Sequence, residues 1–173
     1  MSAAAFRILL GILGTGALAL SGCDAPRRYA AAQGIHDFLA AVQADDRVGF
    51  EAHVDRPALR TELRRELAAA AAGAGLSGRA LDRLLNRGGG AIDQLITPGS
   101  FRIAWRKFGG GTGAAPSALE LAALVRMLDP THACLHDARG SGPCILTFAD
   151  EGGTWKLEAI QPTAIRVASG RTI

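Results

Sequence analysis

The sequence predicts an α+β fold in which N-terminal helices are followed by an antiparallel β-meander of three to four strands. Apolar residues recur at three- and four-residue steps as far as Leu128, which is the periodicity of amphipathic helices. From His132 onward, short runs of β-forming residues separated by glycine-rich turns replace that periodicity. Because the helices come first and the strands last, the order favours α+β over an alternating, parallel α/β sheet.

Residues 1–22 have the organisation of a bacterial export signal. Arg7 and the α-amino group give a weakly positive start, and residues 8–20 form an apolar run of 13 residues without a charge. A membrane-spanning helix needs about 20 such residues, so the shorter run fits the hydrophobic region of a signal peptide. It ends in Leu20-Ser21-Gly22-Cys23, which matches the lipobox of bacterial lipoproteins.

The lipobox predicts cleavage before Cys23 and lipid attachment to its thiol. Each buried methylene contributes about 0.8 kcal/mol, so two or three acyl chains, palmitate among them, make a lasting anchor. We therefore expect a lipoprotein of the cell envelope that is held on a membrane and faces the periplasm. Asp24 resembles the inner-membrane retention signal of enterobacteria, but the choice between inner and outer membrane stays open. The alternatives are a plain secretory signal with a chance cysteine and an uncleaved anchor.

The mature chain is expected to form one domain. Residues 23–28 would be a lipidated tether, residues 29–162 a single α+β domain, and residues 163–173 a C-terminal strand or tail. Of the 173 residues, 49% are hydrophobic and 20% are charged, which is typical of a globular protein. The formal net charge is only +3, of which the signal contributes one through Arg7, so we expect no nucleic acid as a partner.

Helices are predicted in the first half of the domain. Residues 29–44 have helical periodicity, Asp46 is placed to cap a short second helix, and Pro57 lies in the first turn of a third, where its missing N–H has no cost. The apolar residues that these helices should bury are Ile35, Phe38, Leu39, Val42, Phe50, Val54, Leu59, Leu63 and Leu67.

Further helices are predicted up to residue 128. Ser77 is placed to cap one that stops at Gly88-Gly89-Gly90, and Thr97-Pro98 begins another. Residues 109–116 read as a glycine-rich loop, after which Ser117 and Glu120 form a capping box. The apolar positions of these segments are Leu81, Leu84, Leu85, Ile92, Leu95, Ile96, Phe101, Trp105, Phe108, Leu121, Leu124, Val125 and Leu128.

Three strands are predicted after Asp129-Pro130, over residues 132–137, 143–148 and 154–160. In the third strand Trp155, Leu157 and Ala159 alternate with Lys156 and Glu158, so one face should be buried. Ile165 and Val167 would extend this meander by a fourth strand or belong to a tail.

Three short motifs resemble a bacterial domain-of-unknown-function family, number 2939. They are Val-Asp-Arg-Pro-Ala-Leu-Arg at residues 54–60, Leu-Ile-Thr-Pro-Gly at 95–99 and Trp-Lys-Leu-Glu-Ala-Ile at 155–160, and the resemblance spans residues 29–162. The chain departs from the pattern at Arg56, where an aromatic residue is expected, and at Gly99, where glutamate is expected. The family has no assigned activity, so the resemblance implies no function. Helices that end in the pattern Asp-Asp-x-x-x-Phe, here Asp45, Asp46 and Phe50, before a curved sheet also resemble the cone-shaped folds related to nuclear transport factor 2, an analogy of fold alone.

Cys134 and Cys144 are predicted to form a disulfide. They stand on either side of a predicted turn, and the export signal directs the chain to an oxidising compartment. With Cys23 lipidated, an even number of cysteines remains. Closing an 11-residue loop would stabilise the fold by about 3 kcal/mol. The alternative is a pair of reduced cysteines that face the core.

His132, Cys134 and His136 offer a competing interpretation as metal ligands. Residues two apart on a strand share a face, so two imidazoles and a thiolate would converge. A closed zinc site needs four ligands, however, and no fourth lies nearby in sequence. A disulfide would also remove Cys134 from the set. We therefore expect no metal or other cofactor and interpret both histidines as residues of a half-exposed strand.

Residues 101–108 predict a basic aromatic helix. Arg102, Trp105, Arg106 and Lys107 would suit contact with anionic lipid headgroups beside the anchor. The alternative, which the pattern favours, is a core-facing aromatic stripe flanked by solvated cations.

The sequence gives no sign of a catalytic constellation. The glycine runs lack the Gly-Lys-Ser/Thr ending of a phosphate loop. His36-Asp37 and the pair His53 and Asp55 have no credible nucleophile beside them, and capping explains the serines at helix starts: Ser77, Ser100 and Ser117.

The sequence therefore favours a non-enzymatic envelope lipoprotein. Its partners would be membrane lipid, through acylated Cys23, and an unknown envelope protein or small ligand. The alternative is an enzyme or small-ligand-binding protein with a pocket in the concave face of the sheet; a metal carrier is a third possibility. A pocket with at least two polar groups of perturbed titration would indicate an enzyme, whereas an apolar patch would indicate a binding module.

Overall fold

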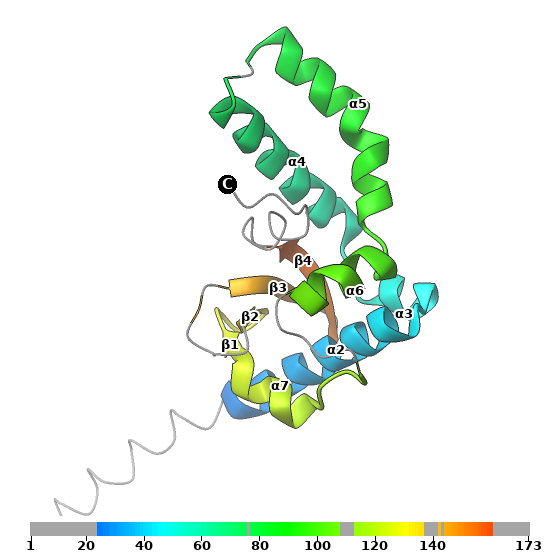
Figure 1. The fold of residues 1–173 in the computed structure, drawn as a ribbon. Helices are drawn as coiled ribbons and strands as arrows, with labels where there is room; N and C mark the ends of the chain where they lie inside the picture. The colour runs from blue at the N-terminus through cyan, green and yellow to red at the C-terminus, as the bar shows by residue number, and fades with distance from the viewer. Residues whose placement is uncertain (1–23, 76, 108–112, 137–141, 143, 161–173) are drawn as a thin grey trace, which may run out of the picture.

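The computed structural model of the chain describes residues 24–75, 77–107, 113–136, 142 and 144–160. Helices in the N-terminal part are followed by one antiparallel sheet with the strand order β1-β2-β3-β4, so the predicted α+β meander is confirmed (Figure 1). The elements are α2 (Asp24–Ala44), α3 (Arg47–Ala52), α4 (Arg56–Gly73), α5 (Arg79–Leu95), α6 (Pro98–Lys107), α7 (Ala118–Leu124), β1 (Val125–Met127), β2 (His132–His136), β3 (Cys144–Glu151) and β4 (Thr154–Ile160).

Helix α2 is the element around which the core forms. It contacts α3, α6 and α7 as well as strands β1, β3 and β4, while α4 and α5 pack against each other as a hairpin that extends away from α2 (Figure 1). Residues 24–28, expected to form a tether, belong to this helix, which is described from Asp24 onward. The largest fully buried side chains of the core are Phe38, Phe50, Phe148, Ile35, Leu39, Leu59, Ile96, Leu121, Leu135 and Leu157.

The predicted starts of α3, α4 and α7 are confirmed. In each, a short side chain just before the helix accepts a hydrogen bond from an N–H group of the first turn. Asp46 accepts hydrogen bonds from the N–H groups of Val48 and Gly49 at the start of α3. Asp55 does the same for α4 through Ala58, and Pro57 lies in its first turn. At α7, Ser117 and Glu120 form the predicted capping box. These caps satisfy N–H groups that have no partner within the helix.

Two predictions about α5 are wrong. The residue that precedes the helix is Gly78, with φ 55°, and no side chain caps it, so Ser77 is not the cap. The helix also continues through Gly88-Gly89-Gly90 to Leu95. Each glycine costs a helix about 1 kcal/mol relative to alanine. Burial of Ile92 and Ile96 beyond the glycines offsets that cost. The side chains of Leu81, Leu84 and Leu85, predicted to form the buried stripe of this helix, lie outside the described residues.

The end of α7 also differs from the prediction. The helix ends at Leu124, and Val125, expected on its apolar face, begins the additional strand β1. Val125 pairs with Leu135 of β2, and the Leu128 N–H donates to the His132 carbonyl at 2.8 Å to close the turn. Val125 stays buried as a strand residue, so the apolar pattern alone did not distinguish the two structures. The predicted extension at Ile165 and Val167, like Phe108, falls outside the described residues.

Gly34 allows α2 to pack closely against the first residues of β4. A Cβ atom at Gly34 would lie 2.6 Å from the Cβ of Trp155, an atom fixed by the strand backbone. We expect Gly34→Ala to lower the free energy of unfolding by about 1–2 kcal/mol in denaturant titrations, because overpacking of about 1–3 kcal/mol exceeds the helix-propensity gain of about 0.5–1 kcal/mol.

Gly90→Ala is the matched control for that substitution. Gly90 also lies in a helix, but a Cβ there meets nothing within 4 Å. This variant should raise the free energy of unfolding by about 0.5–1 kcal/mol. Equal effects of the two substitutions would contradict the close approach of α2 and β4.

Candidate functional site

An apolar cavity lies between the sheet and the helices. Its volume is about 130 Å³, and its walls come from α2, α4, α5, α6, β3 and β4. Phe38 and Phe101 are its most buried aromatic residues, whereas Leu95, at the margin, is 57% exposed. The polar groups on the described lining side chains are the indole N–H of Trp105 and the hydroxyl of Ser100, which lies 3.0 Å from the hydroxyl of Thr97.

The lining determines what the cavity can do. None of its described side chains titrates, so they offer no general acid, base or charged ligand for a substrate. Dry cavities of about 150 Å³ lined by leucine, isoleucine and phenylalanine accept a benzene-sized apolar group. The arrangement is therefore suited to hold one ring or one segment of an alkyl chain.

The predicted disulfide between Cys134 and Cys144 is present in the structure. It joins β2 to β3, with 5.6 Å between the two Cα atoms. Cys144 pairs with His136 in the ladder, next to the bulge between Leu135 and His136. Because Cys134 is bonded to Cys144, it offers no thiolate to a metal ion.

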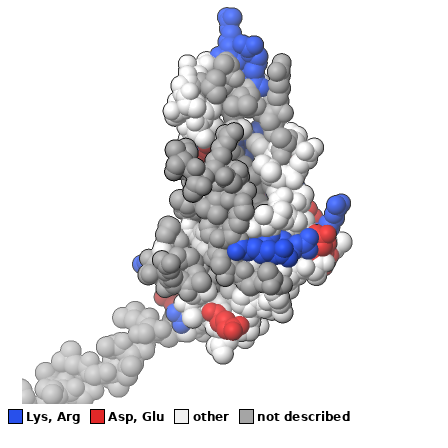
Figure 2. All heavy atoms as spheres, in the orientation of Figure 1, with Lys and Arg blue, Asp and Glu red and all other residues white. Residues whose placement is uncertain are grey.

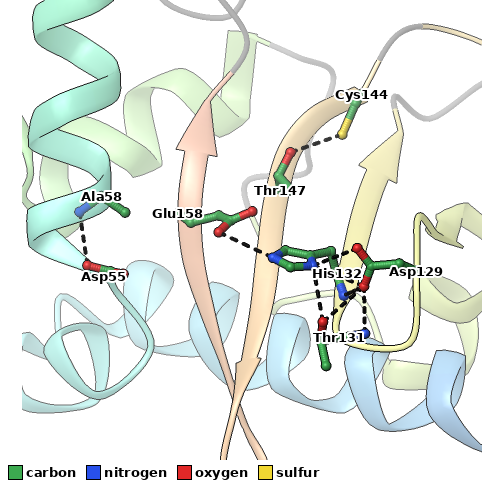
Figure 3. Close-up of polar contacts among 8 residues, drawn as sticks. All are labelled: Asp55, Ala58, Asp129, Thr131, His132, Cys144, Thr147 and Glu158. Carbon is green, nitrogen blue, oxygen red and sulfur yellow. Dashed lines mark hydrogen bonds and ion pairs between the residues drawn. The ribbon is translucent and has the colours of Figure 1, made fainter.

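His132 is held between two carboxylates on the sheet. Its Nδ1 lies 2.8 Å from Asp129, and its Nε2 lies 3.8 Å from Glu158 of β4 (Figure 3). Asp129 also accepts hydrogen bonds from the N–H groups of Thr131 and His132. The Thr131 N–H, together with the His132 ring, lowers the pKa of Asp129 to about 2. Asp129 thus stabilises the tight turn between β1 and β2.

His136 of β2 also has a structural partner. Its Nδ1 lies 2.7 Å from the Gly142 carbonyl, and its Nε2 lies 3.5 Å from the Cys134 sulfur. Within the described residues, no three His, Cys, Asp or Glu side chains are arranged to hold a metal ion. The three residues singled out as weak metal candidates therefore take part in a turn, a disulfide and a hairpin contact.

The four residues of α6 that were predicted to contact a membrane differ in their exposure. Trp105 lines the apolar cavity, while Arg106 is exposed and the Lys107 side chain lies outside the described residues. Arg102 is half-buried and donates a hydrogen bond of 3.4 Å to the Gln43 carbonyl of α2. On the face drawn in Figure 2, basic side chains lie in separate groups, some beside acidic ones. Contact of α6 with a membrane surface stays a prediction.

A second, polar cleft lies between α2, the start of α7 and the start of β4. Its volume is about 560 Å³, and it brings together His36 and Asp37 of α2 with His53, which follows α3. Asp55, the predicted neighbour of His53, instead caps α4. Sequence reasoning missed the cleft because His36 lies in α2, His53 follows α3, and the two residues share no motif.

The three motifs that suggested a family meet in space. Asp55 donates its N–H to the Leu157 carbonyl at 3.0 Å, and Val54 forms a parallel bridge with the same residue of β4. Arg56 donates to the Ile96 carbonyl at 3.0 Å and pairs with Glu51, whose pKa it lowers. The polar start of α4 thus ties the end of α5 to the edge of the sheet.

No described helix is both long and apolar enough to cross a membrane. Cys23 and the predicted signal lie outside the described residues.

Comparison with known protein families gives a match over part of the chain. Residues 29–103 match the sequence model of a family described as a protein of unknown function (DUF2939). The predicted resemblance is therefore confirmed for the two motifs around Pro57 and Pro98, whereas the motif at residues 155–160 lies beyond the matched segment. No match was found among curated proteins or among solved structures.

Proposed function

We propose that this chain, which carries a domain of family 2939, is a lipid-anchored bacterial envelope protein that binds an alkyl chain in its apolar cavity without catalysis. The observation that carries the proposal is the lining of the cavity between α2, α6, β3 and β4. Thirteen described residues line it, and among them only Ser100, with a hydroxyl, and Trp105, with an indole N–H, carry a polar group on the side chain.

The chemistry of the lining favours binding over reaction. Catalysis by proton transfer or nucleophilic attack needs a polar group within hydrogen-bond reach of the substrate. Ser100 is already engaged with Thr97, and its position near the start of α6 is explained by helix capping. Burial of an alkyl segment, by contrast, gains about 0.8 kcal/mol for each methylene.

The size and the opening of the cavity favour a chain over a larger apolar ligand. Its volume of about 130 Å³ accommodates a few methylene groups rather than a fused ring system. The half-buried Trp105 and the exposed Leu95 lie where the rest of a longer chain would leave the protein. A membrane beside the anchor would supply such chains.

The anchor is tested by intact mass spectrometry of the full chain extracted from bacterial membranes. We expect the mass of residues 23–173 plus diacylglycerol, usually with a further acyl chain. A chain without lipid that begins at another residue would contradict the proposed anchor.

The ligand is tested by photocrosslinking in cells that express the full chain and are fed a fatty acid with a diazirine and an alkyne. Digestion and mass spectrometry should locate labelled peptides in residues 95–107, in addition to any probe incorporated on Cys23. Ala104→Leu adds three carbon atoms to the cavity wall and should remove most of this labelling.

Ala123→Leu is the matched control, because Ala123 is exposed on α7 and does not line the cavity. It should leave the labelling unchanged. Equal labelling of the parent protein and Ala104→Leu would show that the alkyl chain does not occupy the cavity.

A further inference from the structure

We propose that the polar cleft is a second ligand site, one that binds the ammonium group of a small amine. The proposal rests on the cleft between α2, α7 and β4 and is independent of the apolar cavity. Seven of its described lining residues carry a polar group on the side chain: Gln33, His36, Asp37, His53, Ser117, Thr154 and Trp155. Its volume of about 560 Å³ falls within the range of small-molecule pockets.

The two histidines of the cleft are fixed in one tautomer. His36 Nδ1 lies 2.7 Å from the Pro116 carbonyl oxygen, and His53 Nδ1 lies 3.1 Å from the Trp155 carbonyl oxygen. A carbonyl oxygen only accepts, so each Nδ1 carries the hydrogen. In the neutral imidazole, Nε2 then holds a lone pair. In its neutral form, each of these two lining residues therefore has a second ring nitrogen that can accept a hydrogen bond.

The negative charge around the cleft favours a positively charged hydrogen-bond donor as its ligand. Asp37 is exposed and supplies a carboxylate, and Glu120 adds another where it binds the lining residue Ser117. The described lining residues include no lysine or arginine. A lining that offers several acceptors and a net negative charge is complementary to an ammonium group, which brings three donors and a positive charge.

The walls of the cleft are held in place before a ligand arrives. Gly34 lets α2 approach Trp155 closely on one side. The capping box of Ser117 and Glu120 fixes the start of α7 on the other. Because the histidines are bonded to backbone carbonyls, their rings lose little freedom on binding, which favours affinity.

The test is isothermal titration calorimetry on the full chain in a non-ionic detergent, at low salt. The probes are 1,4-diaminobutane and 1,4-butanediol, which have the same carbon chain and differ in their end groups. We expect heat of binding with the diamine and none with the diol.

Substitutions by asparagine separate recognition from structure. In His36→Asn and His53→Asn the amide nitrogen replaces Nδ1 as donor to the carbonyl, but the Nε2 acceptor is absent. Each should weaken diamine binding about tenfold or more, as should Asp37→Asn.

Asp82→Asn, which removes an exposed carboxylate from α5, is the matched charge control and should leave the affinity unchanged. Circular dichroism melting curves check that each variant is folded; His53→Asn and Asp37→Asn keep the test valid where His36→Asn unfolds.

Three results would overturn the proposal. Equal binding of diol and diamine would indicate recognition of hydroxyl groups. An equal loss of affinity in Asp82→Asn and Asp37→Asn would indicate general attraction of cations. Binding of Zn²⁺, but not of diamine, that depends on His36 and His53 would indicate a metal site. None of these results bears on the fatty-acid labelling of residues 95–107, so the two proposals fail separately.

Discussion

Phe38→Ala should lower the free energy of unfolding by about 3–5 kcal/mol. Phe38 is fully buried, and its ring centre lies 5.7 Å from that of Phe50 and 5.6 Å from those of Phe101 and Phe148. Truncation removes the contacts of the Phe38 ring with α3, α6 and β3 at once and enlarges the apolar cavity that Phe38 lines. Because domains of this size are stable by only about 5–15 kcal/mol, the variant should lose much of its stability. The measurement is denaturant unfolding followed by circular dichroism.

Two further variants control this measurement. Phe38→Leu keeps most of the side-chain volume and should cost less than the alanine variant. Leu119→Ala removes an apolar side chain that is 76% exposed on α7, so its effect should stay within about 0.5 kcal/mol. An effect of Phe38→Ala no larger than that of Leu119→Ala would exclude Phe38 as the centre of the core.

Removal of the disulfide in a Cys134→Ala, Cys144→Ala double variant should cost about 3 kcal/mol. The bond closes a loop with a sequence separation of 10, and its main contribution is the lower conformational entropy of the unfolded chain. Cys134 is fully buried, so the disulfide should be reduced only when the protein is unfolded. Two alkylated thiols should therefore appear in the parent protein only after reduction under unfolding conditions. The measurement combines alkylation mass spectrometry with thermal unfolding.

Reducing agent provides the control for the disulfide prediction. It should lower the unfolding temperature of the parent protein and leave that of the double variant unchanged. A parent protein that reacts with alkylating reagent at both cysteines without reduction would sink the prediction and make Cys134 available to a metal again.

The features predicted correctly from the sequence depend on residues close together in the chain. Asp46 and the Ser117–Glu120 pair cap their helices through side chains that reach only two or three residues, so the pattern contains all the information. The prediction of the disulfide used only the turn expected between two strands and the export signal expected in residues 1–22. The order of helices and strands followed from a change of periodicity that is visible in the sequence.

The incorrect predictions depend on contacts between distant segments. Val125 became a strand residue because it pairs with Leu135, and α5 passed through its glycines because Ile92 and Ile96 are buried and Asp93 pairs with Arg60 of α4 at 2.7 Å. Both candidate sites arise in the same way, since each joins side chains from several elements. No periodicity in one segment predicts the space that remains when several segments pack.

The start of α2 has a mechanical consequence for an anchored protein. Helix α2 is described from Asp24, the residue after the cysteine proposed to carry the lipid. At a rise of about 1.5 Å per residue, Phe38 lies about 21 Å along the helix axis from Asp24. With Cys23 acylated as proposed, the tilt of α2 relative to the membrane would set the height of the cavity above the bilayer surface. An upright helix would keep the cavity clear of the lipid headgroups, and a tilted helix would bring it down to them. The tilt of this one helix would therefore govern how far a lipid chain must emerge from the bilayer to reach the cavity.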